Sequence, residues 1–177
     1  MKNLKSILLW SFLLTICTVS LQAQDGPEHR MSPVVIEHQI VDDTYMKVVY
    51  GQPFKRGRVI FGELEPFGEV WRAGANESTE ITITNDILFG DQHLSAGTYS
   101  LFAIPEETSW TIIVNAKLGQ WGAYSYEEEK DVLRIEVPVQ QLEEVSEAFT
   151  IGFSDDGSSL DLMWDQTAVS VPVKTLP

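Results

Sequence analysis

The 177-residue sequence has little of the side-chain chemistry from which nucleic-acid and metal sites are built. It contains one cysteine, three histidines, and 12 lysines and arginines against 26 aspartates and glutamates, for a formal net charge of −14. Because neutralising phosphates requires clustered basic side chains in excess, this charge argues against nucleic acid as a partner. No H-x-H or H-E-x-x-H motif connects His29, His38 and His93, so no metal site is expected.

Motifs that announce a cofactor or a nucleophile are absent too. The sequence has no dinucleotide fingerprint, no phosphate-binding loop and no G-x-S-x-G. We therefore expect no cofactor, and no motif identifies a catalytic residue. Nothing in the sequence sets an oligomeric state.

Residues 1–23 have the pattern of a secretory signal peptide. Lys2 and Lys5 precede an apolar stretch over 7–19, and Ala23 offers a small residue before Gln24. The stretch is shorter than the roughly 20 residues of a spanning helix, which disfavours a membrane anchor. We expect an exported protein, periplasmic or extracellular, with no stable membrane insertion after the signal is removed.

Removing this segment changes both the cysteine content and the charge. Cys17 lies inside the apolar stretch and follows Ile16, whereas a lipoprotein signal places a small residue before its cysteine. The mature chain of about 154 residues then has no cysteine, which excludes disulfides and thiolate chemistry. Its net charge becomes −16, because Lys2 and Lys5 are lost.

Helical periodicity is missing from residues 24–177, whereas alternation of apolar and polar residues is frequent. The segment 79–84, for example, reads T-E-I-T-I-T. About ten short strands at spacings near 8–12 residues are typical of a sandwich or a barrel. The strands are expected at 34–41, 44–50, 79–84, 87–89, 92–94, 99–104, 110–115, 132–137, 149–153, 160–164 and 169–173.

The pattern predicts a single all-β domain over residues 24–177. The favoured architecture is an antiparallel β-sandwich of about 9–10 strands, with a closed β-barrel as the alternative. Residues 140–147 are expected to form a short helical turn. The last strand contains Pro172 and is expected at a sheet edge, because proline cannot donate to the ladder.

Two long segments with weak patterning, 51–78 and 116–131, are the candidates for function, because long loops in compact domains are often functional. The first segment contains four basic residues within a stretch of 18: Lys55, Arg56, Arg58 and Arg72. An anionic or polyhydroxyl ligand would suit this composition. The residues proposed to bind it are Arg58, Trp71, Arg72, Asn76 and Glu77.

Each of these residue types suits such a ligand for a chemical reason. Arginine supplies a planar fork for carboxylate or phosphate, and Trp71 could stack on a sugar ring. Asn76 offers both a donor and an acceptor. The alternative is structural: the arginines pair with nearby carboxylates and pin the loop to the sandwich. The carboxylates in question are Glu63, Glu65, Glu69 and Glu77.

The second segment carries aromatic residues among small ones. Trp121 and Tyr124 could form a stacking platform for a carbohydrate and join the first segment's site if the two loops meet. They could equally form a flap that closes the open end of a sandwich.

Several stretches of the chain, taken together, resemble one family. They are Tyr50–Pro53, Gly57-Arg58 with Phe61-Gly62, Pro66–Gly68, Val70–Glu77, Ala96–Phe102, Ile104-Pro105, Trp110–Ile113, Asn115 and Asp131–Arg134. In this order they are similar to the bacterial domain-of-unknown-function 2911 family, over about residues 32–173. The resemblance implies an exported bacterial protein and implies no particular activity.

Three functional hypotheses follow. The leading one is a non-catalytic exported module that binds a small polar, anionic or carbohydrate-like ligand. The second is a hydrolase that uses Glu77 or Asp131 as acid/base, with an arginine stabilising developing negative charge. The third is a structural or protein-interaction component of the cell envelope.

Overall fold

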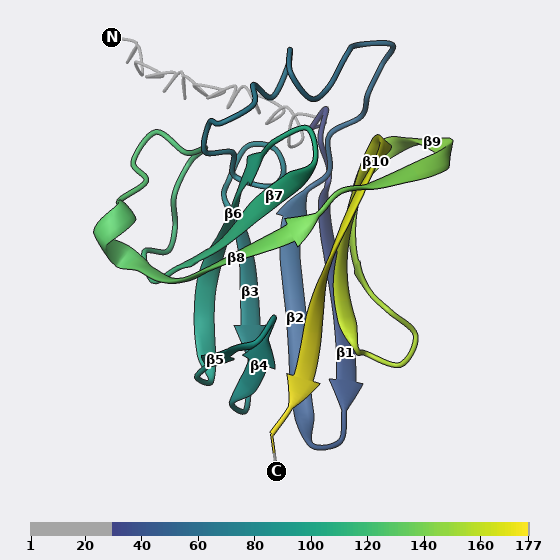
Figure 1. The fold of residues 1–177 in the computed structure, drawn as a ribbon. Helices are drawn as coiled ribbons and strands as arrows, with labels where there is room; N and C mark the ends of the chain where they lie inside the picture. The colour runs from purple at the N-terminus through teal and green to yellow at the C-terminus, as the bar shows by residue number, and fades with distance from the viewer. Residues whose placement is uncertain (1–29, 177) are drawn as a thin grey trace, which may run out of the picture.

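The structure is a computed structural model that describes residues 30–176. The predicted signal peptide lies outside these residues, so it stays a prediction. Two antiparallel sheets make up the described part of the chain (Figure 1). Within it, no helix has the length and apolar character that crossing a bilayer requires.

The larger sheet has six strands in the order β1-β2-β3-β6-β7-β8. Their bounds are β1 Val34–Val41, β2 Thr44–Gly51, β3 Thr79–Ile83, β6 Gly97–Pro105, β7 Ser109–Asn115 and β8 Asp131–Pro138. Neighbours along the chain mostly pair, so the sheet is close to a meander. The first long loop, 52–78, and the pair β4–β5 interrupt it.

The smaller sheet has four strands in the order β5-β4-β10-β9. Their bounds are β4 Ile87–Phe89, β5 Gln92–Leu94, β9 Gln140–Phe153 and β10 Ser159–Thr175. A single 3₁₀ turn, η1 Glu128–Lys130, ends the second long loop, 116–130. The antiparallel sandwich predicted from the sequence is confirmed. The barrel alternative is wrong, since both sheets are open and have edge strands.

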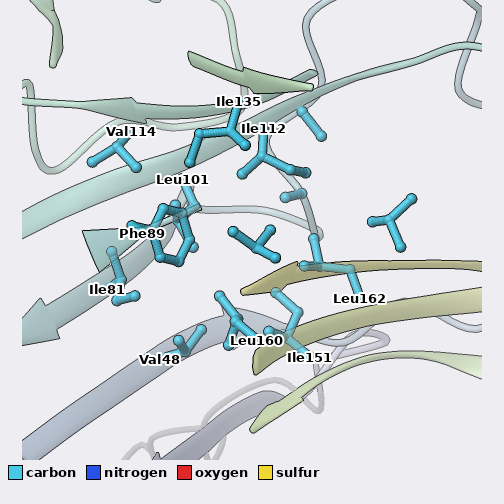
Figure 2. Packing of buried hydrophobic residues seen from close by; sticks show 14 of the residues in the cluster. Val48, Ile81, Phe89, Leu101, Ile112, Val114, Ile135, Ile151, Leu160 and Leu162 are labelled. Atoms are coloured by element: carbon cyan, nitrogen blue, oxygen red, sulfur yellow. The ribbon is translucent and has the colours of Figure 1, made fainter. Parts of the chain in front are cut away.

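The core lies between the two sheets and follows from the alternation in the strands. In β2, Met46, Val48 and Tyr50 are buried, while Tyr45, Lys47 and Val49 are only half-buried on the outer face. Figure 2 shows side chains of both sheets converging, among them Val48 and Ile81 from the larger sheet and Ile151 and Leu160 from the smaller one.

Two details of the smaller sheet differ from expectation. Residues 140–147 are not a helical turn but the first half of β9, which pairs with β10 through Gln141↔Thr167 and Ser146↔Asp165. Their glutamates and glutamines favour helix locally, but pairing with a long neighbouring strand overrides that weak preference. The strands expected at 160–164 and 169–173 are one strand, β10, with register shifts around Asp165.

The expectation that Pro172 marks an edge strand is also wrong, because β10 lies between β4 and β9. Pro172 lies where β4 ends, and its carbonyl accepts a hydrogen bond from the Gly90 N–H at 2.7 Å. The last β4 residue in the ladder is Phe89, opposite Val173. Pro172 therefore lies beyond the last residue pair of the β4–β10 ladder, where its missing N–H is not needed.

The first long loop crosses one end of the sandwich and links the sheets (Figure 1, top of the view). It pairs with β9 through the bridge Phe54↔Ala148 and with β6 through Trp71↔Ala103. This path buries Ile60 and Trp71 in the core and brings residues 75–78 beside the second long loop.

Candidate functional site

Arg58 binds its own loop. Residues Arg56 and Gly57 both have positive φ (50° and 70°), which turns the chain tightly. The Arg58 guanidinium then donates to two backbone carbonyls, from Nε to Lys55 O at 3.0 Å and from Nη2 to Phe54 O at 2.6 Å. The side chain therefore closes the turn, and two of its donors are already used.

Arg72 lies near Glu65, a half-buried residue whose carboxyl is largely desolvated. Burial raises the pKa of Glu65 to about 7, and the positive charges of Arg72 and Arg58 counteract only part of this rise. The buried Arg72 Nε–H has no hydrogen-bond partner in the described residues. Among residues 30–176, neither Arg72 nor Arg58 forms a direct ion pair with a carboxylate, so the pairing proposed as the structural alternative is not present; their charges act on Glu65 only at longer range.

Trp71 is a core residue and does not offer its ring to a ligand. Only 3% of it is exposed, and its Nε1–H donates to Gly74 O at 3.1 Å. Its ring stacks on Trp164, at 5.9 Å between centroids and 19° between planes, and meets Trp110 and Phe149 edge-on. The stacking role predicted for Trp71 is therefore incompatible with its position.

The two long loops do meet, at residues 76–78 and 120–122. Glu77 and Trp121 form an isolated antiparallel bridge, and the Ser78 N–H donates to Gln120 O at 2.9 Å. The Gly122 N–H donates to Asn76 O at 2.8 Å. Asn76 itself has a left-handed backbone conformation, with φ 66°. Directly opposed residues project to the same face, so the side chains of Glu77 and Trp121 are neighbours.

The aromatic residues of the second loop are open to solvent at this junction. Trp121 is 57% exposed and Tyr124 is 88% exposed. The Tyr124 ring lies against Gly122, where a Cβ would approach a ring carbon to 2.9 Å. Gly122 also has φ 65°, so glycine is required twice: for the turn and for the ring above it.

A pocket of about 330 Å³ opens beside this junction, on the outer face of the larger sheet. Val34 of β1 and Val49 of β2 form its apolar wall, and Gly119 and Gln120 of the second loop form another part of its lining. Glu77, Ser78 and Glu80 supply its polar groups. Trp121 and Tyr124 are not part of this lining and lie on the adjoining second loop. We call the cavity, together with Glu77, Glu80 and these two aromatic residues beside it, the outer-face pocket.

Both carboxylates of the outer-face pocket have contacts that fix them. The Arg30 guanidinium hydrogen-bonds Glu77 and lowers the pKa of its carboxyl. The Glu80 Oε1 accepts from the Gly119 N–H at 3.2 Å. Arg30 offsets the charge of Glu77, whereas Glu80 forms no ion pair within residues 30–176 and leaves the pocket negative. The arginine fork proposed from the sequence, Arg58 with Arg72, does not line it.

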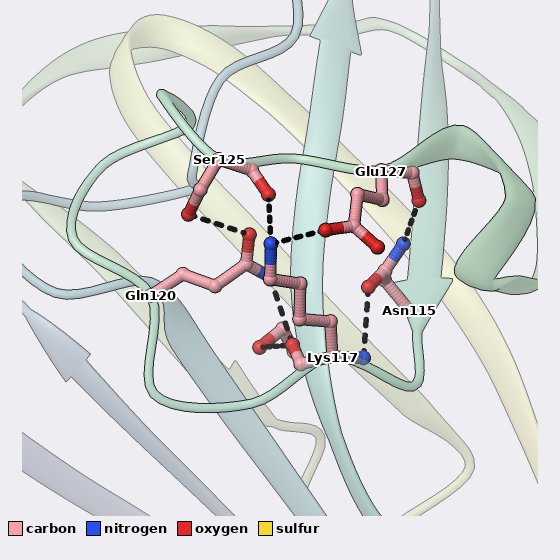
Figure 3. A network of polar contacts seen from close by, with 6 residues as sticks. Asn115, Lys117, Gln120, Ser125 and Glu127 are labelled. Atoms are coloured by element: carbon pink, nitrogen blue, oxygen red, sulfur yellow. Dashed lines mark hydrogen bonds and ion pairs between the residues drawn. The ribbon is translucent and has the colours of Figure 1, made fainter.

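A polar network holds the second loop in place (Figure 3). The Lys117 Nζ donates to Ser125 O and to Glu127 Oε1, both at 2.6 Å. The buried Asn115 donates to Glu127 O at 2.9 Å and accepts from the Lys117 N–H at 2.9 Å. Gln120 donates back to Lys117 O at 2.8 Å, so the loop that carries Trp121 is tied down at several points.

Asp131 belongs to the same support. Its carboxylate accepts from Asn115 Nδ2 at 2.7 Å, Tyr126 Oη at 2.6 Å and Arg134 Nε at 2.7 Å. Burial, together with the Asp131 carboxylate, raises the pKa of Tyr126 to about 12, which keeps its hydroxyl a donor. Both oxygens of Asp131 are therefore engaged by structural donors.

Sequence reasoning missed Val34, Val49, Glu80 and Gln120 as lining residues. The alternation of 79–84 did place Glu80 on the face opposite Ile81, but it could not show that the second loop folds over that face. Among the described residues, no three His, Cys, Asp or Glu side chains gather closely enough to hold a metal ion.

Comparison with known proteins gives one match. A family model described as "Protein of unknown function (DUF2911)" matches residues 32–173, most of the chain. No curated protein and no solved structure matches significantly.

Proposed function

We propose, on the premise that this chain belongs to the DUF2911 family, that the protein is an exported, non-catalytic module that binds a neutral, carbohydrate-like ligand in the outer-face pocket. The observation that carries the proposal is the exposed Trp121 opposite Glu77, with the exposed Tyr124 three residues further along the same loop. The family description supplies no activity, so the proposal depends on this chemistry alone.

The side chains suit a ring with hydroxyl groups. An exposed indole or phenol ring stacks on the apolar face of a sugar. The carboxylates of Glu77 and Glu80 accept hydrogen bonds from hydroxyls, and such charge-assisted bonds are about twice as strong as neutral ones. An anionic ligand is disfavoured, because Glu77 and Glu80 line the cavity, only Glu77 is paired, with Arg30, and no basic residue is part of the lining. The net charge of −14 likewise disfavours nucleic acid.

Binding is favoured over hydrolysis by the state of the two candidate acids. A general acid needs a raised pKa, whereas Arg30 lowers the pKa of Glu77. Asp131 accepts hydrogen bonds from three side chains of the loop support. Neither carboxyl group is therefore poised to transfer a proton to a ligand.

The binding test uses a panel of neutral oligosaccharides, with isothermal titration and tryptophan fluorescence as readouts. We expect Trp121→Ala and Tyr124→Ala each to weaken binding by about tenfold or more, which is about 1.4 kcal/mol. Phe67→Ala is the matched control, because Phe67 is a partly exposed aromatic of the first loop that lies neither in the cavity lining nor on the second loop. Equal losses in all three variants, or no binding by the wild type, would contradict the proposal.

Export is proposed from the N-terminal pattern of residues 1–23. Expression of the full chain in a bacterium, followed by fractionation and N-terminal sequencing, tests it. The expected mature protein starts near Gln24 and lies in the periplasm or the medium. An intact N-terminus in the cytoplasmic fraction would rule export out.

A further inference from the structure

Four strands form the edges of the two sheets, and three of them carry features that block pairing with another strand. β5 has only three residues. β8 presents Arg134 and Glu136 on its outer face and ends at Pro138. β9 has three glutamates between 143 and 147, and part of the first loop pairs with it at Ala148. Charges, proline, short length and coverage are the usual protections of sheet edges.

The fourth edge, β1, has weaker protection: its single charged residue is Glu37, and the turn between β9 and β10 reaches it at Gln39, whose Nε2 donates to Asp155 O at 3.0 Å, and at Val41. Its eight residues, V-V-I-E-H-Q-I-V, contain no proline, lysine or glycine, and they pair with β2 in an unbroken register. Within residues 30–176, β2 is the only strand that pairs with β1. The outward residues Val34, Ile36 and Ile40 are large and apolar, with Ile36 and Ile40 60% and 62% exposed.

We propose that β1 pairs antiparallel with β1 of a second copy of this chain, across a twofold axis at His38. The two six-stranded sheets then join into one continuous sheet. An axis perpendicular to the sheet keeps the outer face of each copy outward, so opposed residues must have the same parity. This condition leaves a short set of registers to compare.

The register centred on His38 is self-complementary. It places Ile36 opposite the partner's Ile40 on the outer face, and Val35 opposite the partner's Val41 on the inner face. Glu37 lies opposite the partner's Gln39, which is an amide. A register centred on Glu37 would instead oppose two carboxylates, which destabilises a strand pair. Of these two registers, the one centred on His38 avoids the pair of opposed carboxylates and brings the exposed isoleucines together.

Repulsion between two negatively charged copies is smallest where few acidic residues lie, and β1 is such a surface. The molecule carries a net charge of −14, but β1 contains only one acidic residue, Glu37. Pairing here keeps most carboxylates of the two copies apart, and at physiological salt repulsion is screened beyond about 8 Å. Burying Ile36 and Ile40 at the joint removes the largest exposed aliphatic side chains of the strand from water.

Sedimentation velocity of the wild type over about 1–100 µM is the first test, with dissociation constants near micromolar corresponding to about −8 kcal/mol. We expect a dimer that Ile36→Lys weakens at least tenfold. Val132→Lys is the matched control, because Val132 is an exposed aliphatic residue on the protected edge β8. Circular dichroism confirms that each variant is folded.

The register has a test of its own. On the axis, the two opposed Cα atoms lie about 4.5–5.5 Å apart, within the range of a disulfide. His38→Cys, in a chain with Cys17→Ser, is expected to give a covalent dimer on mild oxidation. Lys47→Cys in the same chain is the control, since Lys47 pairs with His38 but lies one strand away from the edge.

Three results would overturn the proposal. They are a monomeric wild type at about 100 µM, equal weakening by Ile36→Lys and Val132→Lys, and no covalent dimer from His38→Cys. A wild type that stays monomeric and binds a different protein through β1 would also overturn the proposal. None of the readouts involves a carbohydrate, so failure here and failure of the binding proposal are distinguishable.

Discussion

At the scale of single residues, Glu65 is the carboxyl group whose burial has the clearest consequence. Its pKa of about 7 lies above the ordinary 4.5, because desolvation outweighs the attraction of Arg72 and Arg58. The folded state therefore binds more protons than the unfolded state between these values. The stability that Glu65 contributes is full below about pH 4.5 and is lost as the pH rises through about 7.

Glu65→Gln should remove this pH dependence. We expect the variant to be more stable than the wild type at about pH 8.5, by on the order of 2 kcal/mol, and similar to it at about pH 5. Urea denaturation at both pH values measures the difference. Glu63→Gln, at an exposed neighbouring position, is the control and should change little. A variant that is less stable than the wild type at the higher pH would contradict the expectation.

Gly51 lies where the neighbouring backbone leaves no room for a side chain. A Cβ built there would lie 2.0 Å from Ala75 O, and the Ala75 N–H donates to Gly51 O at 3.0 Å. Gly51→Ala must therefore push the first loop away from β2, and we expect a loss of about 3 kcal/mol or more. Gly152→Ala is the control, since nothing lies within 4 Å of its Cβ. Similar denaturation midpoints for the two variants would refute the argument.

The candidate site illustrates what residue types alone could and could not predict. Glu77, Trp121 and Tyr124 were proposed as binding residues from composition; the structure pairs Glu77 with Trp121, and their role in binding stays a prediction. Trp71 has the same chemistry as Trp121, but it is buried in the aromatic cluster around Trp164, and no local pattern distinguishes the two. Burial of a loop residue depends on the path of the whole loop.

At the scale of elements, local sequence was sufficient wherever alternation was strong and insufficient where it was weak. The strands of the larger sheet were predicted to within a residue or two, because one face of each is buried or, in β1, half-buried. The first half of β9 is mostly exposed, so its polar residues carry no period-two signal. Its strand character comes from pairing with β10.

Anchoring of the second long loop to the larger sheet depends on the buried Asn115. It makes three hydrogen bonds, to Glu127, Asp131 and Lys117. Asn115→Ala leaves several of these groups unpaired, so we expect a loss of about 2–3 kcal/mol. We also expect faster hydrogen exchange at residues 117–126. Thr111→Ala, a substitution on the outer face of the same strand, is the control.

Two outcomes would separate anchoring from a general effect on the sheet. If Asn115→Ala destabilises the protein but leaves exchange in 117–126 unchanged, the loop is held by other contacts, such as those of Lys117. If both variants accelerate exchange equally, the effect belongs to β7 itself. Either result would reject Asn115 as the specific anchor.

At the scale of the whole molecule, added salt changes the stability of the folded state in opposite directions through the net charge and through the ion pairs. The charge of −14 destabilises the folded chain through self-repulsion, which salt screens. The ion pairs, such as Lys117–Glu127 and Arg134–Asp131, are stabilising and are also screened. Most are partly exposed, and exposed pairs contribute only about 0–1 kcal/mol each. We therefore expect the repulsion to dominate.

The expected result is a melting temperature that rises by roughly 3 °C between about 20 mM and 300 mM NaCl at neutral pH, which is about 1 kcal/mol for a chain of this size. The measurement uses Ile36→Lys, so that self-association through β1 does not contribute. Near the isoelectric point of about 4.4, net repulsion vanishes and the rise should disappear. A melting temperature that falls with salt at neutral pH would mean that the ion pairs outweigh the net charge, and that the acidic excess is spread too widely to destabilise the sandwich.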